Sequence, residues 1–80
     1  MPQSVTSLVA LVRDGTDAQK ANAAGTLAML AFCDDANRVS IADAGGIAPL
    51  MELLRDGTDE QKANAAGALR VLADNDASRM

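Results

Sequence analysis

Apolar residues recur at helical spacing along most of the chain, and turn-forming residues divide the pattern into segments. Leu50, Leu53 and Leu54 lie three, four and one residues apart, which places them on one face of a helix. Pro49 suits the first turn of that helix, where a missing amide hydrogen costs least. Gly57 follows the last turn, and we expect it to end the helix in the left-handed conformation.

A second and longer helix is predicted directly after this turn. Thr58 to Gln61 fits a capping box, in which the Thr hydroxyl and the Gln side chain each accept a bond from a main-chain amide. Thr16 to Gln19 repeats the box. The helix is expected from Gln61 to about Ala73, with a buried stripe made of Ala65, Ala66, Leu69, Leu72 and Ala73.

A third, shorter helix is predicted from about Asn37 to Ala44, before the first two in the order of the repeat. Val39, Ile41 and Ala42 are expected to point inward from it. The pair Gly45-Gly46 is expected to stop it.

The chain contains an internal duplication. Leu8 to Ala31 aligns with Leu50 to Ala73 at an offset of 42, with 17 of 24 positions identical. The identities resume beyond this segment when one residue is dropped from the second loop, so the period is 41 to 42 residues. Helical solenoid repeats of the HEAT and armadillo kinds have periods of about 40–47 residues. Three helices in each period favour armadillo repeats over the two-helix HEAT repeats.

The residues also resemble the armadillo family directly. Residues 37–47 resemble the first helix and glycine turn of such a repeat, residues 49–55 its second helix and residues 63–73 its third. The resemblance implies an all-α fold, a right-handed α-α superhelix (solenoid) of armadillo-type three-helix repeats. We expect residues 1–34 to form a first repeat lacking its short first helix, residues 35–75 a complete second repeat, and residues 76–80 the start of a truncated third.

The resemblance implies a function in protein binding. Armadillo arrays bind extended peptides or partner proteins along a concave face lined by the longest helix of each repeat. The Trp and Asn that hold the peptide in nuclear import adaptors fall on Gly25 and Met29, and on Gly67 and Val71, so import-type recognition of basic tails is not expected. The remaining binding face is predicted to include Asn22, Thr26, Met29, Asn64, Ala68 and Val71. Asn22 and Asn64 either bond to an extended chain or are merely tolerated polar positions.

The ends of so short a stack are expected to lack cover, because such repeats are stabilised by their neighbours. The residues expected to lack part of the cover that a neighbouring repeat supplies are Leu8, Leu11, Val12, Leu69 and Leu72. We therefore predict a homo-oligomer, most simply a dimer formed by end stacking or helix exchange. Two functions stay open: a non-catalytic protein-interaction module, and a minimal repeat fragment of natural or engineered origin that mainly self-associates into an armadillo-like stack.

Composition narrows the chemistry further. The chain has no His to act as a base or metal ligand, so neither an enzyme nor a bound cofactor is expected. Its single cysteine, Cys33, excludes an internal disulfide, favours an intracellular setting, and is expected to be a buried or half-buried inert thiol. A net charge of -4 and one aromatic residue argue against nucleic acid, and no apolar run is long enough for a membrane span.

The 17 alanines predict thin, closely packed helices. Gly25 and Gly67 interrupt strong helical segments at a cost of about 1 kcal/mol each relative to Ala. Such a cost indicates either a close approach of two helices or a shallow spot on an exposed face. Asp34 and Asp35 are interpreted as helix-capping loop residues rather than metal ligands.

Overall fold

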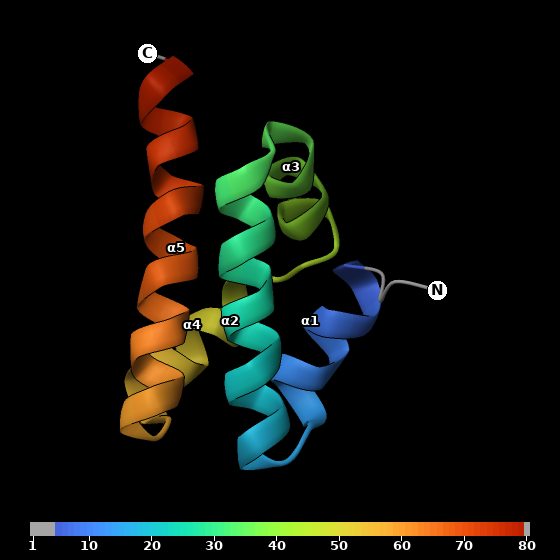
Figure 1. Ribbon diagram of the computed structural model, residues 1–80, viewed down its shortest axis with the longest axis vertical. Coiled ribbons are helices and arrows are strands. Elements are labelled where there is room, and N and C mark those ends of the chain that lie inside the picture. Colours follow the sequence, from blue (N-terminus) through green and yellow to red (C-terminus); the bar gives the residue numbers. More distant parts are fainter. Residues whose placement is uncertain (1–4, 80) are drawn as a thin grey trace.

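The computed structural model describes the backbone of residues 5–79 and the side chains of residues 5–73. The described backbone contains five α-helices and no β-strand: α1 (Val5–Asp14), α2 (Asp17–Cys33), α3 (Asp35–Asp43), α4 (Ile47–Asp56) and α5 (Asp59–Arg79) (Figure 1). The predicted all-α fold is confirmed. We call α1 and α2 repeat one, and α3 to α5 repeat two.

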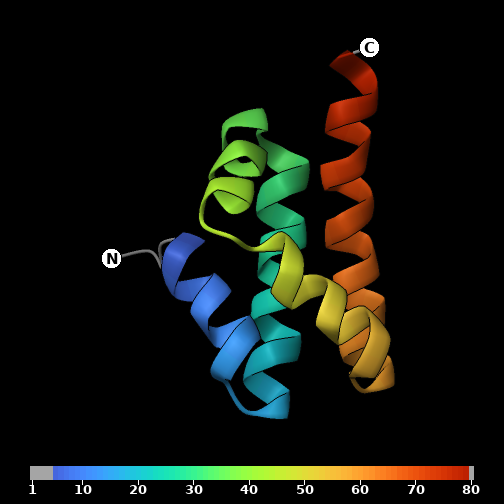
Figure 2. The same cartoon turned by 180° about the vertical axis from the view of Figure 1, so that it is seen from behind.

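The helices are arranged in two layers. Helices α2 and α5 lie side by side and share the most extensive contact between any two helices within residues 5–79. Helix α1 packs on α2, and α4 packs on α5, so that the two shorter helices form the second layer (Figure 2). Helix α3 packs against α2 and also contacts α1 and α5. Each repeat therefore contributes one long helix to the first layer and one ten-residue helix to the second, repeat two adds α3 against α2, and repeat two lies beside repeat one.

Both long helices begin with the predicted capping box. The Gln19 amide donates to Thr16 Oγ1 over 3.2 Å, and the Thr16 amide donates to Gln19 Oε1 over 3.0 Å. The corresponding distances are 3.1 and 3.0 Å between Gln61 and Thr58. These bonds satisfy main-chain amides that have no partner in the first turn of a helix.

Glycines end the shorter helices in two different ways. Gly45 has a φ of 77° and stops α3, as expected for a residue in the left-handed region. The left-handed conformation predicted for Gly57 is wrong, because its φ is −80°. The reason for a glycine here is steric: a Cβ would lie 2.6 Å from the Leu53 carbonyl oxygen and 2.7 Å from Gln61 Oε1. The capping box folds back over this position and leaves no room for a side chain.

The core is made largely of small residues. Its largest fully buried side chains are Leu8, Val12, Leu27, Ile41 and Leu50. Alanines fill the space between α2 and α5, where Ala24, Ala31, Ala65 and Ala68 are all completely buried. Short side chains allow two helices to approach closely, because little volume separates their backbones.

Some of the predicted inward-facing residues are wrong. In the stripe on α5, Ala65 and Leu72 are buried and Leu69 is half-buried, but Ala66 and Ala73 are exposed. They lie on the side of α5 that turns away from repeat one. In α3 only Ile41 is buried, while Val39 and Ala42 are exposed.

Helix α5 is also longer than expected. Its predicted end lies near Ala73, and the helix continues to Arg79. Residues 74–79 contain no glycine or proline, which are the residues that most strongly oppose helix continuation. The third repeat expected to start at residues 76–80 lies outside the residues whose side chains are described.

Candidate functional site

The residues of α2 that belong to the predicted binding face are all exposed. Asn22, Thr26 and Met29 lie on its outer side, and the Met29 side chain is 66% exposed. The Thr26 hydroxyl donates to the Asn22 carbonyl oxygen over 2.9 Å, so that hydroxyl is already engaged within the helix. Phe32, one turn beyond Met29, is 78% exposed and was not part of the predicted face. The sequence signal for it was its mismatch with Asp74, the residue 42 positions later.

The equivalent residues of α5 are less accessible. Asn64 and Val71 are half-buried, and Ala68 is completely buried. Ala68 therefore does not line a surface, which corrects its place in the predicted face. The reason is that this side of α5 packs against α2, whereas the same side of α2 has no helix against it among the described residues.

Asn64 joins the two repeats. Its side-chain amide donates to the Ala21 carbonyl oxygen over 2.9 Å. The amide lies over Gly25, where a Cβ would sit 3.4 Å from Asn64 Nδ2. Gly67 differs, because a Cβ there would meet no atom of the described neighbours within 4 Å. Gly25 therefore faces the Asn64 side chain of the other repeat at an ordinary contact distance, and a shallow spot on an exposed face applies to Gly67.

Gln61 makes a second bond between the repeats. Its side chain is 2% exposed, and its Nε2 donates to the Asp17 carbonyl oxygen over 2.9 Å while its Oε1 caps α5. Gln19 makes the same cap but is exposed. The sequence predicted that Gln61 caps its helix but not that it bonds to Asp17. The two capping boxes have the same Thr, Asp and Gln, and their sequence does not show that among the described residues Gln61 alone of the two glutamines faces another repeat.

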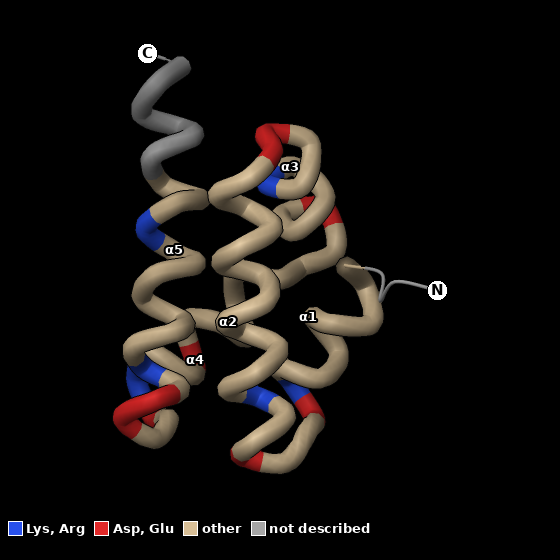
Figure 3. Tube along the Cα trace, in the orientation of Figure 1, with Lys and Arg blue, Asp and Glu red and all other residues tan. Residues whose placement is uncertain are grey.

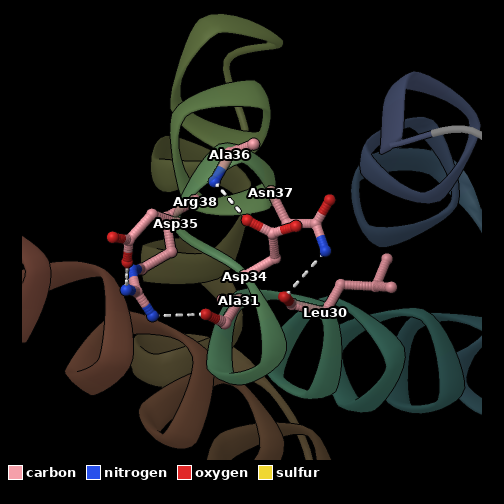
Figure 4. A network of polar contacts seen from close by, with 7 residues as sticks. All are labelled: Leu30, Ala31, Asp34, Asp35, Ala36, Asn37 and Arg38. Carbon is pink, nitrogen blue, oxygen red and sulfur yellow. Dashed lines mark hydrogen bonds and ion pairs between the residues drawn. The ribbon is translucent and has the colours of Figure 1, made fainter.

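A network of polar side chains fixes α3 on the end of α2 (Figure 4). Asn37 Nδ2 donates to the Leu30 carbonyl oxygen over 2.9 Å, and Arg38 donates to the Ala31 carbonyl oxygen over 2.5 Å. Arg38 also pairs with Asp35. The last carbonyls of a helix lack partners within it, so these bonds satisfy the end of α2 and hold α3 against it; their role is structural.

Asp34 caps α3, as its interpretation predicted. Its carboxylate accepts from the Ala36 amide over 2.9 Å. Among the described residues, no group of three or more acidic or cysteine side chains could hold a metal ion.

The predicted ends are better covered than expected. Leu8 and Val12 are each 2% exposed and Leu72 is 8% exposed, while Leu11 and Leu69 are half-buried. The prediction that all five lack cover is therefore wrong for Leu8, Val12 and Leu72. Leu8 is buried within its own repeat, as its counterpart Leu50 is, whereas Val12 lies on the side of α1 that repeat two covers.

Other apolar side chains are exposed instead. They are Ile47, Met51 and Leu54, all on α4. The residues 42 positions earlier, on α1, are half-buried or buried: Val5, Val9 and Val12. Helices α3 and α4 cover that side of α1, and no described helix covers the same side of α4.

The charged residues of the repeated RDGTD segments gather at one end of the molecule (Figure 3). Arg13 pairs with Asp14 over 3.2 Å and Arg55 with Asp56 over 3.3 Å, all with exposed side chains. Exposed pairs of this kind contribute little to stability. These segments therefore act as turns between helices.

Cys33 is exposed, contrary to its predicted burial. It is the last residue of α2 and lies on the same outer side as Asn22 and Met29. No helix among the described residues is long and apolar enough to cross a membrane.

The comparison with known families agrees with this architecture. The sequence profile described as the Armadillo/beta-catenin-like repeat matches residues 34–74, which include α3, α4 and the first four turns of α5. No curated protein and no solved structure matches the chain at a significant level. Since the match covers more than half of the 80 residues and coincides with one unit of short, longer and longest helix, the chain belongs to the armadillo/beta-catenin-like repeat family.

Proposed function

We propose that the chain is a non-catalytic protein-interaction module that binds an extended segment of a partner across the exposed side of α2. Armadillo repeats are in general protein-interaction modules. The observation that carries the proposal is the exposure of two large apolar side chains, Met29 and Phe32, one turn apart on α2, with the exposed Asn22 two turns before Met29 on the same helix. Exposed apolar groups that lie together commonly mark interaction sites.

The chemistry of this face favours a neutral, partly apolar segment. Met29 and Phe32 supply apolar contacts, and Met adapts its shape to different partners. The Asn22 side chain can both donate to and accept from a peptide main chain. Since the Trp and Asn of the import adaptors are replaced at Gly25 and Met29, the clamp that they would form on the peptide is absent. We therefore expect weak binding, and stronger binding where further repeats extend the face along a right-handed superhelix.

A peptide screen by thermal shift tests this function. At a fixed chain concentration, a ligand that binds the folded state raises the midpoint, by about 2.7 kcal/mol of apparent stability at 100 times its Kd. For a peptide that binds, Phe32→Ala and Met29→Ala should each weaken binding about fivefold or more. Val39→Ala is the matched control, because Val39 is 45% exposed but lies on α3. Equal losses in all three variants, or none in any, would contradict the assignment of this face.

A second candidate function is self-association into an armadillo-like stack. The observation that favours it is the exposure of Ile47, Met51 and Leu54 on α4, at positions whose counterparts in α1 are covered by the next repeat. Burial of apolar surface at about 25 cal/mol per Å² would drive such an association. Sedimentation velocity over a dilution series measures it. A mass equal to one chain at all concentrations up to the millimolar range would rule it out.

A further inference from the structure

The contact between the repeats is polar as well as apolar, and both of its sides are displayed again at the ends of the molecule. Repeat two supplies two donors, Gln61 and Asn64, and repeat one supplies two acceptors, the carbonyl oxygens of Asp17 and Ala21. The donors recur 42 positions earlier as Gln19 and Asn22, which are exposed on α2. The acceptors recur 42 positions later as the carbonyls of Asp59 and Ala63, two exposed residues of α5.

These repeated groups lie on two opposite faces of the molecule. The leading face is the side of repeat one that turns away from repeat two and contains Leu11, Gln19, Asn22 and Thr26. The outer face is the side of repeat two that turns away from repeat one and contains Leu54, Asp59, Ala63, Gly67 and Arg70.

A groove between the repeats also has walls whose residues recur, 42 positions away, at the two ends of the molecule. Repeat two forms one wall of it with Pro49, Glu52, Leu53, Asp56, Gly57 and Gln61. The residues 42 positions earlier line an open depression on the leading face: Ser7, Ala10, Leu11, Asp14, Gly15 and Gln19. The opposite wall is formed by Val12, Arg13, Asp17 and Lys20. Its counterparts on the outer face are exposed: Leu54, Arg55, Asp59 and Lys62. Each end therefore displays one wall of a groove that the other end completes.

The burial of apolar residues repeats the pattern. The residues of repeat one that face repeat two include Val9, Ala21, Ala24 and Ala31, all buried. Their counterparts on repeat two are all exposed: Met51, Ala63, Ala66 and Ala73. The outer face thus carries the same kind of apolar surface that repeat two covers on repeat one.

We propose that two molecules of this chain join head to tail, the leading face of one on the outer face of the other. Gln19 and Asn22 of the first molecule donate to the main-chain carbonyls of Asp59 and Ala63 of the second. The Asn22 amide lies over Gly67, as Asn64 lies over Gly25 within one molecule. The inference rests on the self-association proposed above and adds its direction and its residues. Because the two faces differ, each addition leaves one of each free, so the assembly is open-ended.

Three differences make this contact weaker than the one inside the chain. Ala10 stands where Glu52 lies, so a carboxylate that lines the inner groove with Arg13 and Lys20 has no counterpart on the leading face. Thr26 stands on the leading face where repeat two has Ala68, and Arg70 stands on the outer face where repeat one has Ala28. Replacing Thr26 and Arg70 together by Ala should therefore lower the dissociation constant, by about tenfold if both side chains hinder the contact.

The test uses two variants of the full chain, each of which disables one face. Asn22→Asp keeps the size of an exposed side chain but places a carboxylate against the Ala63 carbonyl. Gly67→Gln places a side chain where the Asn22 amide of the other molecule would lie. The change should not disturb the fold, because no described neighbour lies within 4 Å of a Cβ there and Gln favours the helix. Circular dichroism and thermal unfolding should show both variants folded. Sedimentation velocity should show the dissociation constant of each raised at least about tenfold.

Mixing the two variants decides the direction. Asn22→Asp retains an intact outer face, and Gly67→Gln retains an intact leading face, so an equal mixture should form dimers with one chain of each kind and nothing larger. The double variant mixed with Asn22→Asp should stay monomeric. Association of the wild type that neither variant weakens, or no dimer in the mixture, would overturn the head-to-tail contact while leaving self-association standing. A wild type that stays monomeric would overturn both.

Discussion

The contribution of the hydrogen bond from Asn64 to the Ala21 carbonyl can be tested with an internal control, because the duplication supplies an equivalent residue that does not make the bond. Asn22 and Asn64 occupy equivalent positions in α2 and α5, but only Asn64 donates to a neighbouring repeat among the described residues. The same substitution, Asn→Ala, can therefore be made twice in one chain. The substitution changes helix propensity equally at both sites, but it changes the contact between the repeats only at Asn64.

The magnitudes follow from the structure. Asn→Ala within a helix is favourable by about 0.5 kcal/mol in propensity, at either site. At Asn64 the bond of 2.9 Å is lost, and a part-buried hydrogen bond contributes about 1 kcal/mol net. The Ala21 carbonyl remains in the helical ladder of α2, so no orphaned polar group adds to the cost. Asn22→Ala should raise the free energy of unfolding by about 0.5 kcal/mol, and Asn64→Ala should lower it by about the same amount.

Urea and thermal unfolding measure the difference. The two variants should differ by about 1 kcal/mol, or roughly 4–8 °C in Tm for a chain of this size. The measurements belong at the lowest chain concentration that gives a signal, so that any association does not contribute. An unchanged slope against urea would show that only the folded state is affected. Equal shifts at both sites would refute the reasoning, because they would show that the bond between the repeats adds nothing to stability.

Three further outcomes are expected from the surroundings of equivalent residues in the two repeats. Gln61→Ala should lower the Tm by about 4–8 °C more than Gln19→Ala, because both lose a cap and only Gln61 also loses a bond of 2.9 Å, as thermal unfolding of the pair will show. Gly67→Ala should raise the unfolding free energy by about 0.5–1 kcal/mol in a urea titration, and Gly25→Ala should gain less, since its Cβ would lie 3.4 Å from an amide nitrogen. Gly57→Ala should lower it by about 1–3 kcal/mol, since its Cβ would lie 2.6 Å from a main-chain oxygen, and a value near zero would contradict that contact.

The helices and most of their boundaries could be predicted because their signals are local, whereas α5 runs six residues beyond its predicted end near Ala73. A capping box, a glycine pair and a three-to-four residue spacing act within a few residues, and α3, α4 and the starts of α2 and α5 lie close to where these signals put them. Gly57 shows the limit of such signals. A glycine after a helix has more than one possible reason, and here the reason is the folded-back Gln61 side chain rather than the backbone angle.

The roles of the repeated residues could not be predicted, because equal sequence does not mean equal surroundings. Gln19 and Gln61 are identical in type and lie in nearly the same local sequence, yet one is exposed and the other is 2% exposed. What distinguishes them is that repeat one packs against Gln61, whereas no described repeat packs against Gln19. Spacing within one helix names the residues that share a side, but it does not say which side meets a neighbour.

The differences between the copies carry the information that their identities lack. Seven of the 24 aligned positions differ, and at six of them the more buried copy holds the smaller side chain. These six pairs are Val9 and Met51, Ala10 and Glu52, Val12 and Leu54, Ala68 and Thr26, Ala28 and Arg70, and Val71 and Met29.

In five of these pairs the smaller side chain lies where α2 meets α5 or where α1 meets repeat two, and the larger or charged one lies where the described structure has no neighbour. In the sixth pair Glu52 lines the groove between the repeats and Ala10 lies on the leading face. The contact inside the chain is therefore better fitted than a contact between chains through the same two faces. Any head-to-tail assembly should dissociate on dilution while the two repeats within each chain stay packed together. The Thr26→Ala and Arg70→Ala changes should strengthen the contact between molecules and so reduce its difference from the contact inside the chain.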